Sequence, residues 1–158
     1  MTRINLIDPV ELTDQHLIAE YREIRLLCAN FVRSMHSKRG LRPEEIPKQF
    51  TLNTGHVRFF YDKGLYLHKR YDSLKFEMVN RGFSPNNEFP VDVWTRESYN
   101  DWHATSRDKQ IVRERIQLRI SQKPNWYRYK GKPLNESGLQ KSMPDPAVSI
   151  SDGVGCTI

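Results

Sequence analysis

The chain has 158 residues, a length typical of one domain that can bury a hydrophobic core. Only 37% of the residues are hydrophobic, and no run approaches the roughly 18 apolar positions of a membrane span, which excludes an integral membrane protein. The formal net charge of +6 at pH 7 suggests an anionic partner.

The start of the sequence and its cysteines indicate an intracellular protein. Residues 1–6 contain no apolar signal-peptide core, and Thr2 stands where N-myristoylation requires glycine. Cys28 and Cys156 match neither a disulfide framework nor a zinc spacing, so we expect a reducing compartment, with Cys28 in the core. We predict a cytoplasmic or nucleoid- or nucleus-associated location, without secretion.

Three helices are predicted in chain order. Residues 10–36 form the first, because apolar residues from Leu17 to Met35 recur at alternating spacings of four and three. Residues 62–81 form the second, with Gly82 as its C-terminal stop. Residues 83–104 show no period and are predicted to be a long surface connection. The third helix is expected to begin near Thr105 or Ser106 and to end before Pro124.

Positive charge is concentrated towards the C-terminal end of the predicted domain. Residues 107–132 hold nine basic and two acidic side chains, while the rest of the chain sums to about neutral. In the third helix, Arg115, Arg119 and Lys123 share one face beside its apolar residues. Cations beside a core need an acidic partner or a bound anion. The alternative is that their long stems extend to water.

Aromatic and basic residues alternate directly after the third helix. Trp126, Tyr127 and Tyr129 lie among Lys and Arg, a pattern that suits nucleic acid, because bases stack on aromatic rings while cations bind phosphates. The same aromatic residues could instead pack this segment onto the helices. From Leu134 onward the composition is typical of a disordered tail, so we predict a domain at 1–133 and a tail at 134–158.

One face of the first helix carries His16, Glu20 and Glu23, at positions i, i+4 and i+7. These residues could be solvated charges or could bind a divalent metal. A third interpretation makes Glu23 a lone acid/base or cation-stabilising carboxylate that faces a basic surface, with Arg115 and Arg119 as neighbours.

Several colinear motifs carry a resemblance to a known family. They are Met1-Thr2-Arg3-Ile4-Asn5-Leu6, Glu11-Leu12, Asp14-Gln15-His16-Leu17, Ala19-Glu20-Tyr21-Arg22-Glu23, Gly55-His56-Val57, Phe59-Phe60-Tyr61-Asp62-Lys63, and Pro124 with Trp126-Tyr127. Over about residues 1 to 133, the chain closely resembles the phage and algal-virus pyrimidine-dimer DNA glycosylases of the endonuclease V type.

The resemblance implies a compact, all-α single domain of three main helices with long loops, in which the N-terminus threads between helices. It implies a monomeric DNA repair enzyme that needs no cofactor or metal and acts on double-stranded DNA with cyclobutane pyrimidine dimers or abasic sites. Such an enzyme removes the 5′ base of the dimer and then cuts the strand as an AP lyase. The implied nucleophile is the α-amine of Thr2 after removal of Met1, and the essential carboxylate is Glu23.

The resemblance also assigns the DNA-binding residues. Those implied to bind phosphates or the lesion strand are Arg3, His16, Arg22, Arg115, Arg119 and Lys123, and those implied to assist lesion recognition include Trp126, Tyr127 and Tyr129. The sequence departs from the family at position 26, where Leu26 replaces an arginine and the nearest basic residue is Arg25.

The chemistry can be argued from the residues as well. An α-amine with a pKa of about 7.7–8.0 is partly neutral at pH 7, whereas a lysine near 10.4 needs a large depression before it can attack. Two further hypotheses come from other classes of protein. One is a non-catalytic DNA-binding protein for damage sensing or packaging, and the other is a metal-dependent nuclease built on His16, Glu20 and Glu23.

Overall fold

The longest helix begins four residues later than predicted, at Asp14 and not at residue 10. The computed structural model describes residues 3–134, in which a short 3-10 helix, η1 (Pro9–Glu11), precedes α1 (Asp14–Met35). Thr13 is the N-cap of α1, because its hydroxyl accepts the His16 backbone N–H at 3.2 Å. The predicted helix over 10–36 is therefore confirmed, with its first residues in a separate turn.

The other two long helices also follow their sequence signals. Helix α3 (Gly64–Asn80) ends just before Gly82, which has a φ of +85°. Helix α4 (Ser106–Gln122) begins with a capping box, in which Thr105 and Asp108 each accept the other's backbone N–H. The remaining helices are the short α2 (His56–Phe59) and two 3-10 turns, η2 (Pro43–Glu45) and η3 (Val91–Val93).

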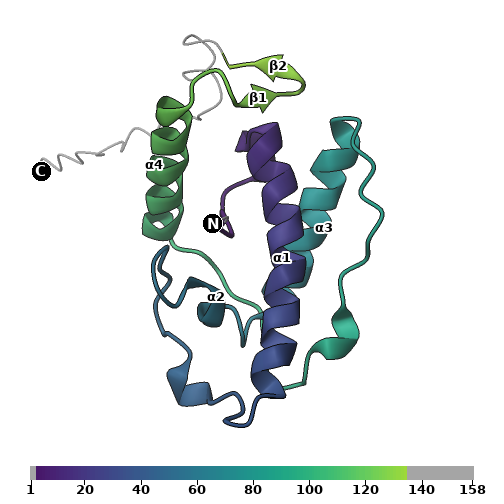
Figure 1. Ribbon diagram of the computed structural model, residues 1–158, viewed down its shortest axis with the longest axis vertical. Coiled ribbons are helices and arrows are strands. Elements are labelled where there is room, and N and C mark those ends of the chain that lie inside the picture. Colours follow the sequence, from purple (N-terminus) through teal and green to yellow (C-terminus); the bar gives the residue numbers. More distant parts are fainter. Residues whose placement is uncertain (1–2, 135–158) are drawn as a thin grey trace, which may run out of the picture.

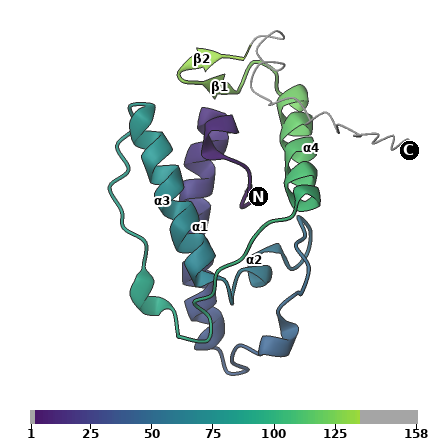
Figure 2. The same ribbon diagram turned by 180° about the vertical axis from the view of Figure 1, so that it is seen from behind.

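Helix α1 occupies the middle of the molecule, with α3 on one side and α4 on the other (Figures 1 and 2). Its apolar stripe packs on α3, and the N-terminal segment of residues 3–7 runs between α1 and α4. Ile4, Leu6 and Ile7 are buried there and form part of one core with the helices. The predicted threading of the N-terminal segment between helices is thus confirmed from residue 3 onward.

The long connection between α3 and α4 is irregular, as expected, but the interpretation of it as a surface segment is wrong in part. Phe89 and Ser98 are buried, and the Trp94 ring stacks on Phe31 at a centroid distance of 4.3 Å. A Cβ on Gly64 would lie 2.6 Å from the Trp94 ring, so this glycine permits the close packing. Isolated aromatic anchors leave no periodic pattern in the sequence, and for this reason they escaped prediction.

The chain after α4 forms a small antiparallel hairpin of β1 (Arg128–Tyr129) and β2 (Lys132–Pro133), which pairs Arg128 with Pro133 and Tyr129 with Lys132. Apart from this hairpin, residues 3–134 are all-α. Within that range no helix has the length and apolar character of a membrane span. Cys28 is a core residue, as predicted, and burial raises the pKa of its thiol to about 12. Cys156 and the predicted tail from residue 135 lie outside the described residues.

Candidate functional site

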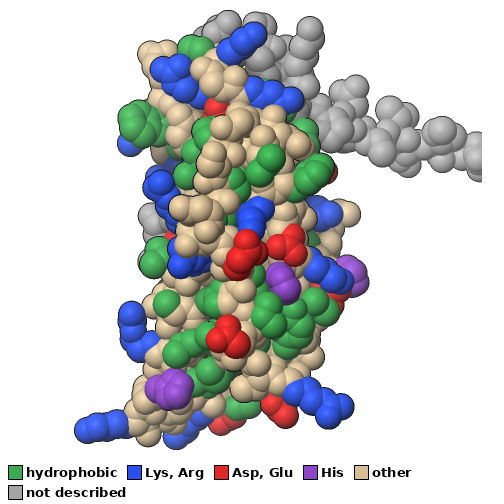
Figure 3. Space-filling model, turned by 90° about the vertical axis from the view of Figure 1, so that its right-hand side faces the viewer, with side chains coloured by type: hydrophobic (Ala, Val, Ile, Leu, Met, Phe, Trp, Pro, Cys, Tyr) green, Lys and Arg blue, Asp and Glu red, His purple; other side chains and the backbone are tan. Residues whose placement is uncertain are grey.

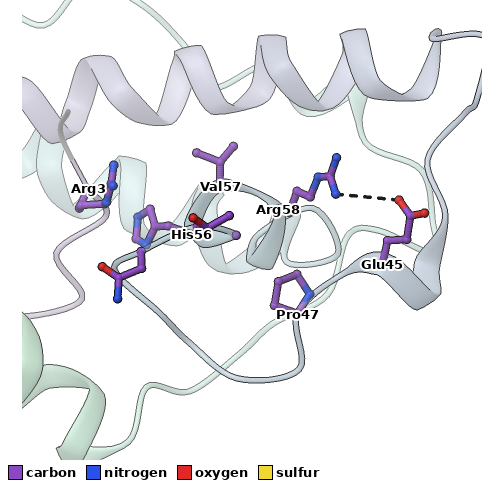
Figure 4. Close-up of a pocket in the computed structure, with 9 residues that line it drawn as sticks. Arg3, Glu45, Pro47, His56, Val57 and Arg58 are labelled. Atoms are coloured by element: carbon purple, nitrogen blue, oxygen red, sulfur yellow. Dashed lines mark ion pairs between the residues drawn. The ribbon is translucent and has the colours of Figure 1, made fainter.

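The N-terminal segment is fixed to the loop that precedes α2 and to α2 itself. Arg3 Nε donates a hydrogen bond of 2.8 Å to the Leu52 carbonyl oxygen. The Ile4 backbone N–H donates to His56 Nε2 at 3.0 Å, and His56 is the first residue of α2. Arg3 and His56 lie side by side in Figure 4. Arg3 and Ile4 are therefore positioned by two contacts with a segment about 50 residues away.

His56 can make its contacts only as a neutral imidazole. Its Nδ1 lies 2.7 Å from the Thr51 carbonyl oxygen, which can only accept, so Nδ1 carries the proton and Nε2 accepts from Ile4. Burial lowers the pKa of His56 to about 4, and the positive charges of Arg3 and Arg115 also lower it, against the opposing effect of the Thr51 bond. The ring therefore stays neutral near pH 7.

A buried ion pair holds the same segment against α1 and α3. Arg70 donates to both carboxylate oxygens of Glu20, from Nε at 2.7 Å and from Nη2 at 3.0 Å, and its Nη1 donates to the Ile7 carbonyl oxygen. Asn5 Nδ2 donates to Glu20 Oε2 at 2.9 Å. Glu20 is 0% exposed, so this network lies in the protein interior.

The position of Glu20 argues against a metal site built on His16, Glu20 and Glu23. The helical period places Glu20 on one face with His16 and Glu23, but the structure turns its carboxylate inward to Arg70. A metal site built on His16, Glu20 and Glu23 would have to break that ion pair. Glu20 is instead a structural residue of the N-terminal segment.

Glu23 lies on the side of α1 that faces this segment. It is two helical turns after His16 and is half-buried. Partial burial raises the pKa of the Glu23 carboxyl above its ordinary value, and the charge of Arg3 opposes that shift. Glu23 is thus a carboxylate whose proton affinity is set by both its partly apolar surroundings and a neighbouring guanidinium.

Three guanidinium groups form a cationic cluster beside this segment: Arg3, whose charge acts on Glu23, and Arg115 and Arg119, whose charges act on His16. Burial lowers the pKa of Arg115, and the charges of Arg119 and Arg3 lower it further. Burial also lowers the pKa of His16 to about 4, and Arg115 and Arg119 add to this effect. Neighbouring guanidinium groups repel one another, and this repulsion destabilises their charged forms. A bound anion would offset the repulsion and stabilise the cluster.

Aromatic side chains border the cationic cluster. His16 and Tyr127 stack in parallel, with centroids 4.8 Å apart and an interplanar angle of 2°. They line a hollow of about 230 Å³ together with Asn5, Arg119 and Trp126, and Trp126 is 63% exposed. Within the described chain, the buried Asn5 Oδ1 has no hydrogen-bond partner. This hollow offers stacking surfaces and cations to a ligand that carries both rings and negative charge.

The hairpin region is anchored to the start of α1. Gln15 Nε2 donates to the Trp126 carbonyl oxygen at 2.7 Å, and Gln15 Oε1 accepts the Arg128 backbone N–H at 2.8 Å. The Asp14 carboxylate accepts the backbone N–H groups of residues 130 and 131, at 3.1 and 2.8 Å. These contacts hold the aromatic residues beside the cationic cluster.

The structure brings most of the predicted site residues together around the start of α1 and the middle of α4. They are Arg3, His16, Glu23, Arg115, Arg119, Trp126 and Tyr127. Arg22 is exposed on α1 about 100° around the helix from Glu23, and Lys123 is exposed at the C-cap of α4. Thr2 lies outside the described residues.

Tyr129 has a different environment from the other predicted aromatic residues. Its hydroxyl donates to the Val10 carbonyl oxygen at 3.0 Å, and the Arg81 guanidinium lies 4.7 Å from the ring centroid. Both contacts pack the hairpin onto the molecule, which is the alternative that the sequence left open for this aromatic segment.

Sequence reasoning missed the residues that position the chain start. His56 occurs in the quoted motif Gly55-His56-Val57 but received no role, and Asn5 and Arg70 were not singled out. A buried, neutral histidine has no sequence signal of its own. The available signal for Glu20 was its apolar neighbourhood on the helical wheel, close to Leu17 and Ile24.

Comparison with known families gives an independent result. The family model for pyrimidine dimer DNA glycosylases matches residues 1–91. The matched region includes the N-terminal segment, α1, α2 and α3, and it ends before α4 and the hairpin.

Proposed function

Because the chain belongs to the pyrimidine dimer DNA glycosylase family, we propose that it excises the 5′ base of cyclobutane pyrimidine dimers and then cleaves the strand at the abasic site. The proposed nucleophile is the α-amine of Thr2, exposed by removal of Met1, and the proposed carboxylate is Glu23. The observation that supports this proposal is the position of Arg3, the residue after Thr2, because its charge acts on Glu23.

The proposed reaction has two stages. The neutral α-amine attacks C1′ and gives up a proton, while the bond from C1′ to the 5′ base breaks. The base takes the electron pair and a proton, and the cyclobutane ring keeps it joined to its 3′ neighbour. Opening of the sugar ring then gives an imine, which makes the C2′ proton acidic. Loss of that proton breaks the bond between C3′ and its oxygen, so that the 3′ phosphate leaves by β-elimination.

Glu23 is suited to both stages. As a carboxylate it stabilises the positive charge that develops on the sugar, and as a base it moves protons during ring opening and elimination. Its raised pKa and half-buried position support the second role, because proton transfer is most efficient when the pKa of the group lies nearer the working pH. Neither stage requires a metal.

Recognition of the dimer is proposed to depend on the shape and deformability of the DNA. A cross-linked pyrimidine pair is already bent and poorly stacked, so kinking the duplex and extruding a nucleotide costs less there. The guanidinium groups of Arg3, Arg115 and Arg119 supply phosphate contacts, and the exposed Trp126 supplies a stacking surface.

A duplex with one cyclobutane dimer tests the proposal. With the dimer strand labelled, the wild-type protein is expected to cleave at the dimer in the presence of EDTA, with the 5′ glycosidic bond broken before the strand. The freed 5′ base stays joined to its 3′ neighbour through the cyclobutane ring. Salt-dependent binding without cleavage would favour a non-catalytic DNA-binding protein. Cleavage that EDTA abolishes would favour a metal-dependent nuclease.

A further inference from the structure

A second group of basic residues lies at the far end of α1, outside the site described above. Arg33 near the end of α1, Arg39 and Arg42 in the following loop, and Arg58 of α2 line a hollow of about 260 Å³. We call it the arginine hollow. The sequence pattern hid it, because these arginines are spread over 26 positions and alternate with uncharged and acidic residues.

Acidic side chains compensate only part of the charge of the arginine hollow. Glu45 forms ion pairs with both Arg39 and Arg58, the latter at 3.9 Å (Figure 4). Among the described residues, no carboxylate lies within ion-pair distance of Arg33 or Arg42. The hollow therefore carries a net charge of about +3, and guanidinium groups bind phosphate oxygens in bidentate geometry.

The arginine hollow continues the surface that begins at Arg3. A larger hollow of about 720 Å³ extends from Arg3 and His56 to Arg58 and Glu45, and the last two residues also line the arginine hollow. Figure 4 shows Arg3 near one end of this space and the Arg58–Glu45 pair near the other. An extended ligand can therefore pass from the N-terminal segment to the arginine hollow without crossing the core.

Helix α1 links the arginine hollow to Glu23, and its geometry gives the distance between them. Arg33 Nη1 donates to Asn30 Oδ1 at 3.2 Å, and Asn30 is two helical turns after Glu23 on the same face of α1. The rise of an α-helix places Asn30 and Arg33 about 10 to 15 Å beyond Glu23 along the axis. The axial rise of B-DNA is about 3.4 Å per nucleotide, so for DNA that runs along α1 this distance corresponds to roughly three to five nucleotides.

We propose that the arginine hollow binds a backbone phosphate of the substrate DNA about three to five nucleotides away from the lesion. The inference rests on the proposed function and adds a binding site on one side of the dimer. Phosphate contacts of this kind carry no base specificity, and they fix the register of the protein on the duplex. The alternative is that these arginines only keep the surface solvated.

The face on the side of α3 provides a matched control. There Lys69 pairs with Asp101 and Lys75 pairs with Glu88, at 2.5 and 2.7 Å. Acidic side chains lie among the basic ones on this face (Figure 3). The double variant Lys69→Gln/Lys75→Gln removes two cations, as Arg33→Gln/Arg42→Gln does, but neither lysine lines the arginine hollow.

The test measures binding to single-dimer duplexes of different arm lengths, in a Glu23→Gln background so that the DNA stays intact. One duplex has arms of about 12 base pairs on both sides, and two others are cut to about two base pairs on one side or the other. The parent protein is expected to lose affinity on one of the two short duplexes. Arg33→Gln/Arg42→Gln should bind the long duplex as weakly as the parent binds that short one. The slope of its log affinity against log salt should be smaller by about one.

Three results would overturn the proposal. The first is that the parent binds all duplexes with equal affinity. The second is that the affinity of Arg33→Gln/Arg42→Gln depends on arm length as strongly as that of the parent. The third is that Lys69→Gln/Lys75→Gln loses as much affinity for the long duplex as Arg33→Gln/Arg42→Gln does. Excision assays with proteins that retain Glu23 distinguish failure of the arginine-hollow proposal from failure of the proposed function. On the long duplex, excision by the wild type is expected whether or not the arginine hollow binds a phosphate, whereas absence of excision by the wild type would contradict the proposed function itself.

Discussion

Replacement of Arg70 by Met is expected to destabilise the protein more than most single substitutions. Glu20 is fully buried, and Arg70 supplies two of the three hydrogen bonds to its carboxylate. Methionine fills much of the volume of the arginine stem but carries no charge and no donor. Arg70→Met therefore leaves a buried carboxylate with one neutral donor, Asn5 Nδ2, and it also removes the donor to the Ile7 carbonyl oxygen.

The magnitude follows from the burial of the pair. Removal of one partner of a buried ion pair costs about 3–5 kcal/mol, a large share of the roughly 5–15 kcal/mol that stabilises a domain. For a domain of this size the loss corresponds to a fall in Tm of roughly 10 °C or more. The double variant Glu20→Gln/Arg70→Met removes both charges, and the Gln carbonyl still accepts from Asn5. It should recover at least half of the loss.

Urea unfolding of the wild type, Arg70→Met, Glu20→Gln and the double variant measures the four free energies of unfolding. The reasoning is refuted if Arg70→Met costs less than about 1 kcal/mol, or if the double variant is as unstable as the sum of the two single losses. Either result would mean that the Glu20 carboxylate does not depend on Arg70 in the folded state.

Three further predictions concern the site. Glu23→Gln should lower base excision from a single-dimer duplex by a factor of about 100 or more while DNA binding survives, and normal turnover would show the carboxylate assignment to be wrong. Arg119→Ala should weaken binding and flatten the dependence of log affinity on log salt by about one, whereas an unchanged slope would exclude a phosphate contact. Because the pKa of His56 is about 4 when folded and near 6.5 when unfolded, stability should fall by up to about 3 kcal/mol as pH drops through that interval. Urea titrations at pH 7 and 4.5 should show a smaller fall in His56→Gln, and an equal fall would contradict the assignment.

The long helices could be predicted because their signals are local. The apolar period of α1, the Thr105 cap of α4 and the stop at Gly82 each involve residues close in sequence. Helix α2 has only four residues, too few to show a period, and the aromatic anchors of the connection between α3 and α4 contact residues far away in sequence. Elements held by distant partners therefore escaped prediction.

The residues of the site also fall into those that the sequence could predict and those that only the structure shows. The cations of α4 and the resemblance to a known family identified Arg115, Arg119 and Glu23 as residues of one site, and the structure brings them together around Arg3. The helical wheel placed Glu20 correctly on its face of α1, but only the structure shows Arg70, 50 positions away, as its partner. Structural ion pairs and catalytic carboxylates look alike in a single sequence.

The central claim is that the α-amine of Thr2 bonds covalently to the deoxyribose beside Glu23, and borohydride trapping tests it most directly. Reaction of a Met1-free preparation with a single-dimer duplex, in EDTA and borohydride, should give a covalent protein–DNA adduct that peptide mass mapping assigns to residue 2. A preparation that retains Met1 should give no such adduct at Thr2. If the Met1-free protein cleaves the duplex but yields no adduct, or an adduct on a lysine side chain, the account is wrong.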